Sequence, residues 1–428
     1  MKETINAELA IVGGGMAGLT AALFAAQRGV STVLVGGPCE LVYAAGVWDL
    51  VAVHPVSEGK LWSDPWAGLA ALVRDIPQHP FARISVQDVS AAFDELLAAV
   101  EAAGLPYCRD PRANVDVVTC VGTRKRTYCI PASMWAGVAA LRDKAPCLLV
   151  DFTGTKDYSA KQIREALEAS WPELRTVRLT FPGTQGLAEV TWDVLARMLD
   201  DRSARVALIE LLRPHLRDER AIGLPAMLGL ERCGQVIAEL REALGVPVFE
   251  IPTPPVSVPG LRLLQALVRL LEQKGCRLMM SRRVTHAASQ ADGSFLLEVR
   301  GAELEHRVHA KAVVLATGRF LGGGLAADRS GIRETLFDLP VHQPAGRHDW
   351  HSRDLFDRHS HAIHQAGLQT DNQLRPLDAY GGPALGRLFA AGSVLAHQDW
   401  TRTKSGTGLA VATAYAAVKA YLELGRGA

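Results

Sequence analysis

The sequence has few of the features that mark several common functional classes. It contains only seven cysteines in 428 residues, and no two of them form a Cys-x-x-Cys pair. Iron–sulfur clusters need closely spaced cysteine thiolates, so we do not expect this chain to hold a cluster by itself. An odd number of scattered cysteines is instead typical of buried thiols in a reducing compartment.

An excess of charge of one sign is also missing. The chain carries 46 basic and 45 acidic residues, which gives a net charge of +1. Because nucleic acids and anionic membranes attract proteins through clustered positive charge, neither is expected as a partner. With 48% hydrophobic and 21% charged residues, the composition is that of an ordinary globular protein.

A metal site is not predicted either. Histidines gather between residues 348 and 364, but they are mixed with Arg and Asp in a segment that shows no strand or helix pattern. Metal ligands need a framework that fixes their geometry, so an exposed loop is the preferred interpretation. The residues concerned are His348, His351, His359, His361 and His364.

Residues 9–26 form a run of eighteen residues without a charge. A membrane-spanning helix needs about twenty apolar residues, but three successive glycines at 13–15 interrupt this run. We therefore expect a buried parallel strand that leads into a packed helix, because such a strand is covered on both faces. The chain should be soluble by itself.

The order of the predicted elements indicates an α/β fold. Residues 8–13 read as a strand, 15–29 as a helix and 31–36 as a second strand, which together form a βαβ unit. Strands and helices alternate again up to about residue 250. An Asp-Gly turn at 292–293 favours a hairpin or a three-stranded meander.

These elements predict a Rossmann-like domain, built of a parallel sheet plus a β-meander, with an inserted α/β second domain. The first part of the main domain is expected at 1–130, the insertion at 131–251 and the second part at 252–428. The proline-rich stretch PTPPVSVPG marks the return from the insertion, and a loop-rich excursion is expected near 340–380.

A glycine motif lies where the first strand turns into the first helix. Gly13, Gly15 and Gly18 form Gly-x-Gly-x-x-Gly; they allow a tight turn, a close approach of backbone to a phosphate, and close packing of the helix. The amides of the first helical turn, which includes Met16 and Ala17, offer hydrogen bonds and a positive dipole to that phosphate. We expect the phosphate of a nucleotide or flavin here.

The acidic residue that usually binds the adenosine ribose is absent from the end of the second strand. Gly36 and Gly37 stand there, and Glu40 lies beyond a proline. Either backbone groups hold the adenosine, or the ligand ends at a single phosphate. The second alternative favours FMN over FAD.

Two later strands also end in small residues. VVLATG ends at Thr317 and Gly318, and LFAAGSV contains Gly392 and Ser393 near its end. Turns with few side chains leave room for a flat ring, so these four residues join the candidate flavin site.

The last helix begins with a second pair of glycines, and a charged loop precedes it. Gly406, Thr407 and Gly408 would place backbone amides where negative charge develops on a reduced flavin. His397, Arg402 and Lys404 in the loop are the candidate catalytic residues, because a cation there could stabilise that charge or bind an anionic substrate. A solvated loop explains the same residues without a function.

Six stretches carry a resemblance to a known family: AIVGGGMAGL, AAGVWDL, IPTPPVSVPGLRLLQAL, KAVVLATGRFLGGGLAADRSGIRE, GLQTDNQLRP and LFAAGSV. In this order they resemble the B subunit of anaerobic glycerol-3-phosphate dehydrogenase, within the wider fumarate-reductase-like flavoproteins. The likeness runs from the first strand to the final helix and is most specific over 318–334. The stretch AAGVWDL adds Ala45 and Gly46 to the candidate cofactor-binding residues.

The resemblance implies a flavin-dependent dehydrogenase subunit with FMN as its cofactor, FAD being the alternative. It also implies two partners: a larger catalytic A subunit that contains FAD, and an iron–sulfur C subunit that tethers the pair to the cytoplasmic side of the inner membrane. Such a complex would oxidise sn-glycerol 3-phosphate to dihydroxyacetone phosphate, a reaction at a CH–OH group, and pass the electrons toward quinone.

The loop HQDWTRTKSG departs from the family, in which this loop is glycine-rich and weakly charged. In relatives that act on dicarboxylates, an arginine in a similar place binds a substrate carboxylate. Arg402 therefore supports a second hypothesis, a free-standing flavin-dependent oxidoreductase of a small hydroxy or carboxylic acid. A scaffold protein without a cofactor is a third, and the three motif glycines argue against it.

Overall fold

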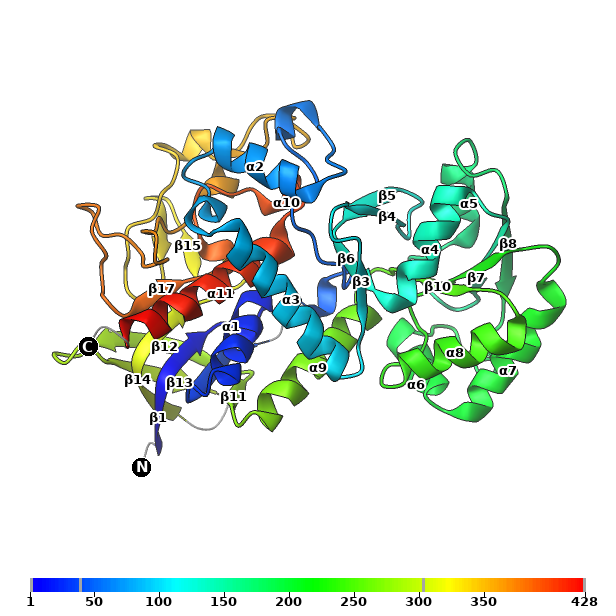
Figure 1. The fold of residues 1–428 in the computed structure, drawn as a ribbon, viewed down its shortest axis with the longest axis horizontal. Coiled ribbons are helices and arrows are strands. Elements are labelled where there is room, and N and C mark those ends of the chain that lie inside the picture. The colour runs from blue at the N-terminus through cyan, green and yellow to red at the C-terminus, as the bar shows by residue number, and fades with distance from the viewer. Residues whose placement is uncertain (1–2, 38–40, 302–304, 426–428) are drawn as a thin grey trace. The chain divides into compact units, whose positions relative to one another are not determined.

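The computed structural model describes residues 3–37, 41–301 and 305–425, and the chain divides into two compact units (Figure 1). Unit 1 comprises 1–40, 49–99 and 267–428, and unit 2 comprises 41–48 and 100–266. The insertion expected at 131–251 falls inside unit 2, which also takes in the residues on either side of it.

Unit 1 is built on a seven-stranded sheet in the order β11-β2-β1-β14-β13-β12, with β17 also paired to β14. The pairs among β11, β2, β1, β14 and β17 are parallel, whereas β12, β13 and β14 form an antiparallel meander. This confirms the predicted α/β fold with a parallel sheet plus a meander. The strands are β1 (Glu3–Val12), β2 (Thr32–Gly36), β11 (Arg277–Met280), β12 (Arg283–Ser289), β13 (Phe295–Arg300), β14 (Glu305–Leu315) and β17 (Leu388–Ala390).

The apolar run at the start of the chain forms β1 and then α1 (Met16–Gln27). Every residue of α1 from 16 to 25 is buried, because the sheet lies on one side of it and α11 (Gly406–Leu424) on another (Figure 1). Phe24 and Tyr415 meet edge to face between these helices, with ring centroids 5.3 Å apart. Among the described residues, no helix combines the length and the apolar character that a membrane span requires.

Unit 2 contains an entirely parallel four-stranded sheet in the order β10-β9-β7-β8. Its strands and helices alternate along the chain, as the sequence pattern predicts. They are β7 (Cys147–Phe152), α5 (Ala160–Leu167), β8 (Leu174–Leu179), α6 (Trp192–Leu199), α7 (Arg202–Leu212), β9 (Ala221–Pro225), α8 (Cys233–Leu244) and β10 (Val248–Ile251), with α4 (Ala132–Asp143) before them.

Shorter elements complete the two units. Unit 1 holds α2 (Pro65–Asp75), the hairpin of β15 (Leu325–Ala327) and β16 (Ile332–Glu334), and α10 (Trp400–Thr403). Unit 2 holds the pairs β3 (Tyr107–Arg109) with β6 (Cys129–Pro131) and β4 (Val115–Val118) with β5 (Arg124–Thr127). The boundary between the units falls within α3 (Val86–Ala102) and α9 (Val258–Gln273).

Candidate flavin site

The parallel strands of unit 1 bring the predicted glycine turns together, because parallel strands all end at the same edge of a sheet. Gly13 follows β1 with a φ of +122°, and its amide donates to the carbonyl of Val35, 2.8 Å away. A Cβ on Gly13 would stand 2.0 Å from the carbonyl oxygen of Ala316, just beyond β14. The turn after β1 therefore touches the end of β14 through backbone alone.

Two more glycines are required by the same close packing. A Cβ on Gly18 would lie 1.8 Å from the carbonyl oxygen of Gly13, and one on Gly36 would lie 2.4 Å from the amide nitrogen of Gly14. Three chain segments thus meet without side chains between them. Gly37 is half-buried with nothing near its Cβ direction, and Glu40 lies outside the described residues.

The N-terminus of α1 has the features of an anion-binding end. Gly15 is the N-cap, no side chain caps the helix, and its first turn contains no acidic residue. Met16 and Ala17 lie in this first turn, where an α-helix has no internal acceptor for its amides. A phosphate at this position would be stabilised by these amides and by the helix dipole.

The turn after β17 packs directly on that helix end. Gly392 has a φ of +78°, and a Cβ there would stand 2.7 Å from the Cβ of Ala17. Its amide donates to the hydroxyl of Thr413 on α11, 2.8 Å away, and Ser393 follows in a 3-10 helix at 392–394. The ends of β1, β14 and β17 are therefore gathered around the start of α1.

Thr317 supplies an unsatisfied polar group at the end of β14. It is buried, and among the described residues its hydroxyl has no hydrogen-bond partner. Gly318 follows with a φ of +68°. An uncapped helix end, turns that exclude Cβ atoms and a spare hydroxyl together fit a phosphate-bearing flavin held mainly by backbone.

The sequence predicts that the amides at the start of α11 face the flavin, and the structure fits this prediction only in part. The amide of Gly408 donates to the carbonyl of Asp49, 2.7 Å away, so it is used within the fold. Gly406 packs against Trp400, whose ring carbon lies 2.8 Å from the glycine's Cβ direction. Gly406 and Thr407, in the first turn of the helix, are the remaining sources of amides for a ligand.

Ala45 and Gly46 belong to unit 2, where Gly46 has a structural role. Its φ is +77°, a Cβ would stand 2.6 Å from that of Pro259, and its carbonyl accepts a 2.7 Å hydrogen bond from the Tyr107 hydroxyl. A cofactor role for Ala45 and Gly46 stays a prediction.

The three candidate catalytic residues are in different situations. The Arg402 guanidinium donates to the carbonyl of Asp357, 2.7 Å away, which reduces its availability to a substrate. Lys404 is exposed and ends α10 with a φ of +51°.

His397 is half-buried, and its Nε2 lies 2.8 Å from the side-chain amide nitrogen of Gln369. Its ring centroid lies 4.0 Å from that of His342. Burial, then the nearby His342 and Arg83, lower the pKa of His397 to about 4. His397 is therefore uncharged at neutral pH and cannot supply the cation that the sequence led us to expect.

The histidines between 348 and 364 take part in local contacts. His361 Nδ1 accepts the amide of Ser352 at 3.0 Å, and His364 lies 3.4 Å from Asp399. Within the part of the chain that the structure describes, no three His, Cys, Asp or Glu side chains are placed to bind a metal together.

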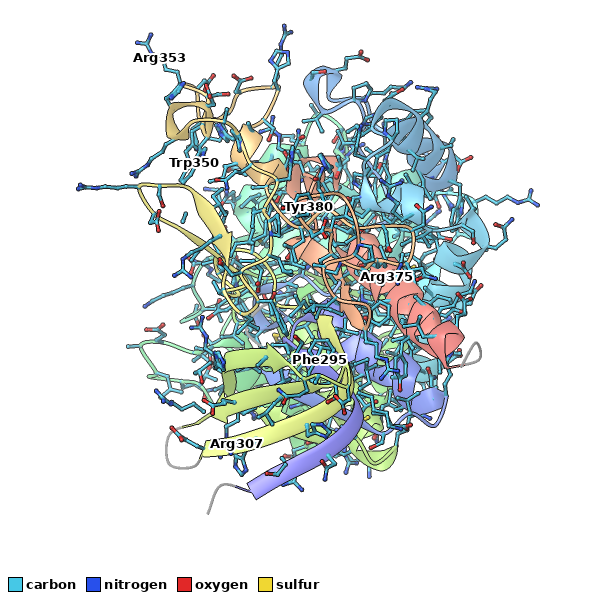
Figure 2. All side chains as sticks on the ribbon, turned by 90° about the vertical axis from the view of Figure 1, so that its left-hand side faces the viewer. Phe295, Arg307, Trp350, Arg353, Arg375 and Tyr380 are labelled. Atoms are coloured by element: carbon cyan, nitrogen blue, oxygen red, sulfur yellow. The ribbon has the colours of Figure 1, made fainter. Side chains whose placement is uncertain are left out.

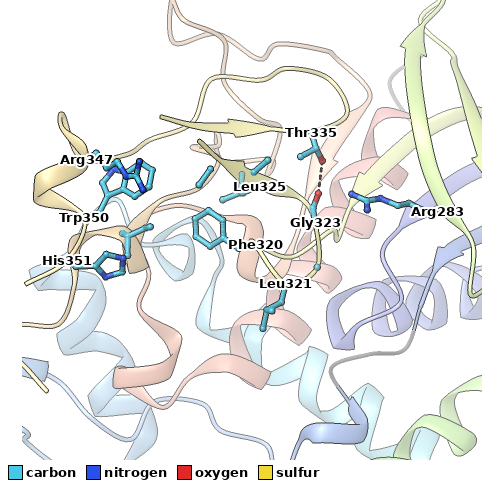
Figure 3. A pocket seen from close by; sticks show the side chains of 13 residues that line it. Arg283, Phe320, Leu321, Gly323, Leu325, Thr335, Arg347, Trp350 and His351 are labelled. Atoms are coloured by element: carbon cyan, nitrogen blue, oxygen red, sulfur yellow. Dashed lines mark hydrogen bonds between the residues drawn. The ribbon is translucent and has the colours of Figure 1, made fainter. Parts of the chain in front are cut away.

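A pocket of about 730 Å³ lies over the loop that follows Gly318. Figure 3 shows Phe320 between Trp350 and His351 on one side and Gly323 on the other, with the Thr335 hydroxyl bonded to the Gly323 carbonyl. None of the predicted site residues lines it. The lining residues are Arg283, Phe320, Leu321, Gly322, Gly323, Leu325, Ala326, Ala327, Thr335, Arg347, Trp350, His351 and Ile363.

Comparison with known families also points to a flavin-binding protein. Residues 8–409 match the family of the FAD binding domain. The fold and the site therefore define a flavoprotein of the fumarate-reductase-like class, with a flavin cofactor and a flavin-dependent oxidoreductase activity.

Full-length relatives narrow this class. A protein of Halobacterium salinarum, named as the probable B subunit of anaerobic glycerol-3-phosphate dehydrogenase, is 34% identical over 435 residues, which cover 98% of each chain. The B subunit of the same enzyme from Pectobacterium carotovorum is 30% identical, covering 95% of this chain and 96% of the relative. The chain belongs to the family of these B subunits.

Among solved structures, 3-ketosteroid delta1-dehydrogenase from Sterolibacterium denitrificans matches with a TM-score of 0.46 and 11% identity, covering 98% of this chain and 100% of that one. The family match supports a flavin, but it does not support FMN as the first choice. The missing ribose acid and the family resemblance both favour FMN, but backbone groups can replace that acid, and the matched family is that of the FAD binding domain.

Proposed function

We propose that the protein is the flavin-containing B subunit of an anaerobic glycerol-3-phosphate dehydrogenase complex. Its reaction would be the oxidation of sn-glycerol 3-phosphate to dihydroxyacetone phosphate, with electrons relayed toward quinone. The observation that carries the proposal is the full-length match to the named B subunits, at 34% identity over 98% of the chain. The close backbone approaches at the ends of the parallel strands independently support the flavin part of this proposal.

We propose FAD as the flavin, because the matching family is that of the FAD binding domain. Gly13, Gly15 and Gly18, with the first turn of α1, would hold its phosphates, and Thr317 and Gly392 would border it. Gly36 and Gly37 would then approach the adenosine through backbone only. A bound flavin supplies the acceptor for a hydride equivalent from a CH–OH carbon and passes electrons on to a further carrier.

The partners are proposed from the names of the relatives, since a B subunit belongs to an assembly. A larger FAD-containing A subunit and an iron–sulfur C subunit would complete it, and the iron–sulfur protein would provide contact with the cytoplasmic side of the inner membrane. The scattered cysteines of this chain are consistent with clusters held elsewhere.

The first experiment identifies the flavin and the substrate together. The purified protein is heated, and the released flavin is separated by chromatography, with FAD expected and FMN as the outcome that overturns the FAD assignment. Intact protein, co-purified with its partner subunits under anaerobic conditions, is then mixed with glycerol 3-phosphate while its flavin absorbance is followed. Bleaching by glycerol 3-phosphate is expected; bleaching by lactate or malate instead would favour the free-standing hydroxy-acid oxidoreductase.

A further inference from the structure

Three segments of unit 1 that are distant in the sequence run side by side through backbone hydrogen bonds. His342 and Gly367 exchange two bonds of 2.8 and 3.0 Å. Leu368 pairs in parallel with Leu395, and its amide donates to Val394 while its carbonyl accepts from Ala396. This small ladder fixes the positions of the side chains at its end.

The ladder brings His342, Gln369 and His397 into one cluster. The two imidazole rings lie 4.0 Å apart, and the Gln369 amide nitrogen lies 2.8 Å from His397 Nε2. His397 comes five residues after Gly392, whose turn packs on the first turn of α1. The segment after Gly392 therefore connects this cluster directly to the proposed flavin site.

Arg83 provides the positive charge beside this cluster. It ends a 3-10 helix at 80–83, is half-buried, and donates a 3.3 Å hydrogen bond to the side-chain oxygen of Asn372. Across the described ranges no carboxylate forms an ion pair with it. Asn372 comes three residues after Gln369, so this hydrogen bond holds Arg83 against the segment that carries Gln369. The charge of Arg83 also contributes to the low pKa of His397.

His342 in this cluster and His79, four residues before Arg83 in the chain, carry no charge at neutral pH. Burial, His54 and His397 lower the pKa of His79 to about 3, and burial lowers the pKa of His342. Asp371, the carboxylate next to Asn372, is already paired with Arg375. Among the described residues, the Arg83 guanidinium thus has no ion-pair partner and stands beside neutral hydrogen-bonding groups. Such a set matches a small molecule with one anionic end and uncharged hydroxyl groups.

We propose that Arg83 binds the phosphate of a polyol phosphate monoester and that His342, Gln369 and His397 hydrogen-bond to its hydroxyl groups. This proposal rests on the proposed function, and it places the substrate of that function at the cluster of His342, Gln369 and His397. It also reassigns the anion-binding role from Arg402, which is hydrogen-bonded to a backbone carbonyl, to a residue that no sequence motif marks.

The test measures binding of glycerol 3-phosphate to the flavin-loaded protein by titration calorimetry. Arg83→Gln should weaken binding by about ten- to a hundred-fold, the range of a lost charge-assisted hydrogen bond, whereas Arg83→Lys should recover part of the affinity. Arg353→Gln is the matched control, because Arg353 projects from the outer edge of the loop-rich segment (Figure 2). Equal affinity of Arg83→Gln and wild type would overturn the proposal.

Histidine NMR gives a second readout that does not depend on activity. Arg83→Gln should raise the pKa of His397 above about 4 in the ligand-free protein, because a lowering charge is removed. Glycerol 3-phosphate should raise it in the wild type, and glycerol alone should not. An unchanged His397 pKa in both experiments would contradict the placement of Arg83 and of the ligand.

The two proposals fail in distinguishable ways. If the wild type binds glycerol 3-phosphate and Arg83→Gln binds it equally well, the site is wrong and the proposed function stands. If lactate or malate, and not glycerol 3-phosphate, binds in an Arg83-dependent manner, the anion site stands and the proposed substrate is wrong. Equal binding of inorganic phosphate and glycerol 3-phosphate would overturn the assigned role of the three neutral side chains.

Discussion

Gly15 and Gly18 belong to one motif, but the structure places different demands on them. Gly15 has a φ of −77° and a ψ of −172°, a conformation open to any residue. Gly18 has no room for a Cβ, because the Gly13 carbonyl oxygen would lie 1.8 Å away. The backbone conformation therefore allows a side chain at Gly15, whereas close packing excludes one at Gly18.

We predict that Gly15→Val abolishes flavin retention with little change in stability, since its side chain would cover amides that the phosphate needs. Gly18→Ala should instead lower the free energy of unfolding by about 1–3 kcal/mol or more, because backbone must move to admit the Cβ. Flavin absorbance after gel filtration and urea unfolding measure the two effects. Full flavin occupancy in Gly15→Val would show that the phosphate lies elsewhere.

We predict that the titration of the buried His79 makes the stability of the protein depend on pH. His79 is fully buried, its Nδ1 accepts the amide of Phe81, and its Nε2 has no partner among the described residues. Its pKa falls from 6.5 to about 3 on folding. Between these values the unfolded chain binds more protons, so stability is complete above pH 6.5 and falls as the pH drops, by about 1.4 kcal/mol per unit well below 6.5.

The measurement is urea unfolding at pH 7 and pH 5 for the wild type, His79→Asn and His348→Asn. Asn keeps an acceptor for the Phe81 amide, so the variant tests the titration rather than the hydrogen bond. His79→Asn should show a smaller loss between the two pH values. His348, whose side chain is 85% exposed, serves as the control, and an equal loss in all three proteins would remove His79 from the explanation.

Single residues also show the limit of prediction from sequence. The glycines could be found because each follows a strand at a fixed spacing, and close packing at a strand end leaves a local signature. Arg83, His342 and Gln369 could not be found, because only backbone pairing between distant segments brings two of them beside His397. The missing ribose acid, one of the two grounds for expecting FMN, is a weak guide because the absence of a side chain does not show what the backbone can bind.

At the scale of elements, one hydrogen bond joins α11 to the turn after β17. The Thr413 hydroxyl is fully buried, accepts the Gly392 amide at 2.8 Å and donates to the Leu409 carbonyl. The hydroxyl of Thr20 in α1 is equally buried, but it bonds only to carbonyls of its own helix. Comparing these two threonines therefore distinguishes a hydrogen bond between two elements from hydrogen bonds within one helix.

Thr413→Val should therefore cost about 1–3 kcal/mol of stability, because it leaves the Gly392 amide buried without an acceptor. Thr20→Val should cost clearly less, since each helix carbonyl keeps its backbone donor. Thermal unfolding measures the difference, and flavin affinity should fall in Thr413→Val alone if the Gly392 turn borders the flavin. Equal losses of stability in both variants would show that the bond does not secure the turn.

The elements themselves were largely predictable where their patterns are local. The expected helix at 15–29 corresponds to α1 (Met16–Gln27), and the Asp-Gly turn joins β12 to β13. The sequence does not reveal that β17 pairs with β14, which also pairs with β1 and β13. Only three residues pair there, and their register depends on the rest of the sheet. The candidate site depends on that pairing, since it brings Gly392 to α1.

At the scale of the whole molecule, the chain contains two units with separate hydrophobic cores. Unit 2 also contains a fully buried ion pair, in which Arg262 donates to both oxygens of Glu250 at 2.6 and 2.8 Å. Burial opposes ionisation of Glu250, but the charge and hydrogen bonds of Arg262 outweigh it and keep its pKa below the usual value. Glu250 also accepts the amide of Leu228, on the loop after β9.

Glu250→Gln should destabilise unit 2 by about 3–5 kcal/mol, because Arg262 stays buried without its countercharge. The control is Glu298→Gln in unit 1, whose partner Arg307 is exposed and whose loss should cost less than about 1 kcal/mol. Hydrogen exchange measured by mass spectrometry resolves the two units: peptides of β9 and β10 should exchange faster in Glu250→Gln, while peptides of β1 and β14 keep their rates. Because α3 and α9 both cross the boundary, equal acceleration in both units would mean that these helices couple the cores into one cooperative unfolding step.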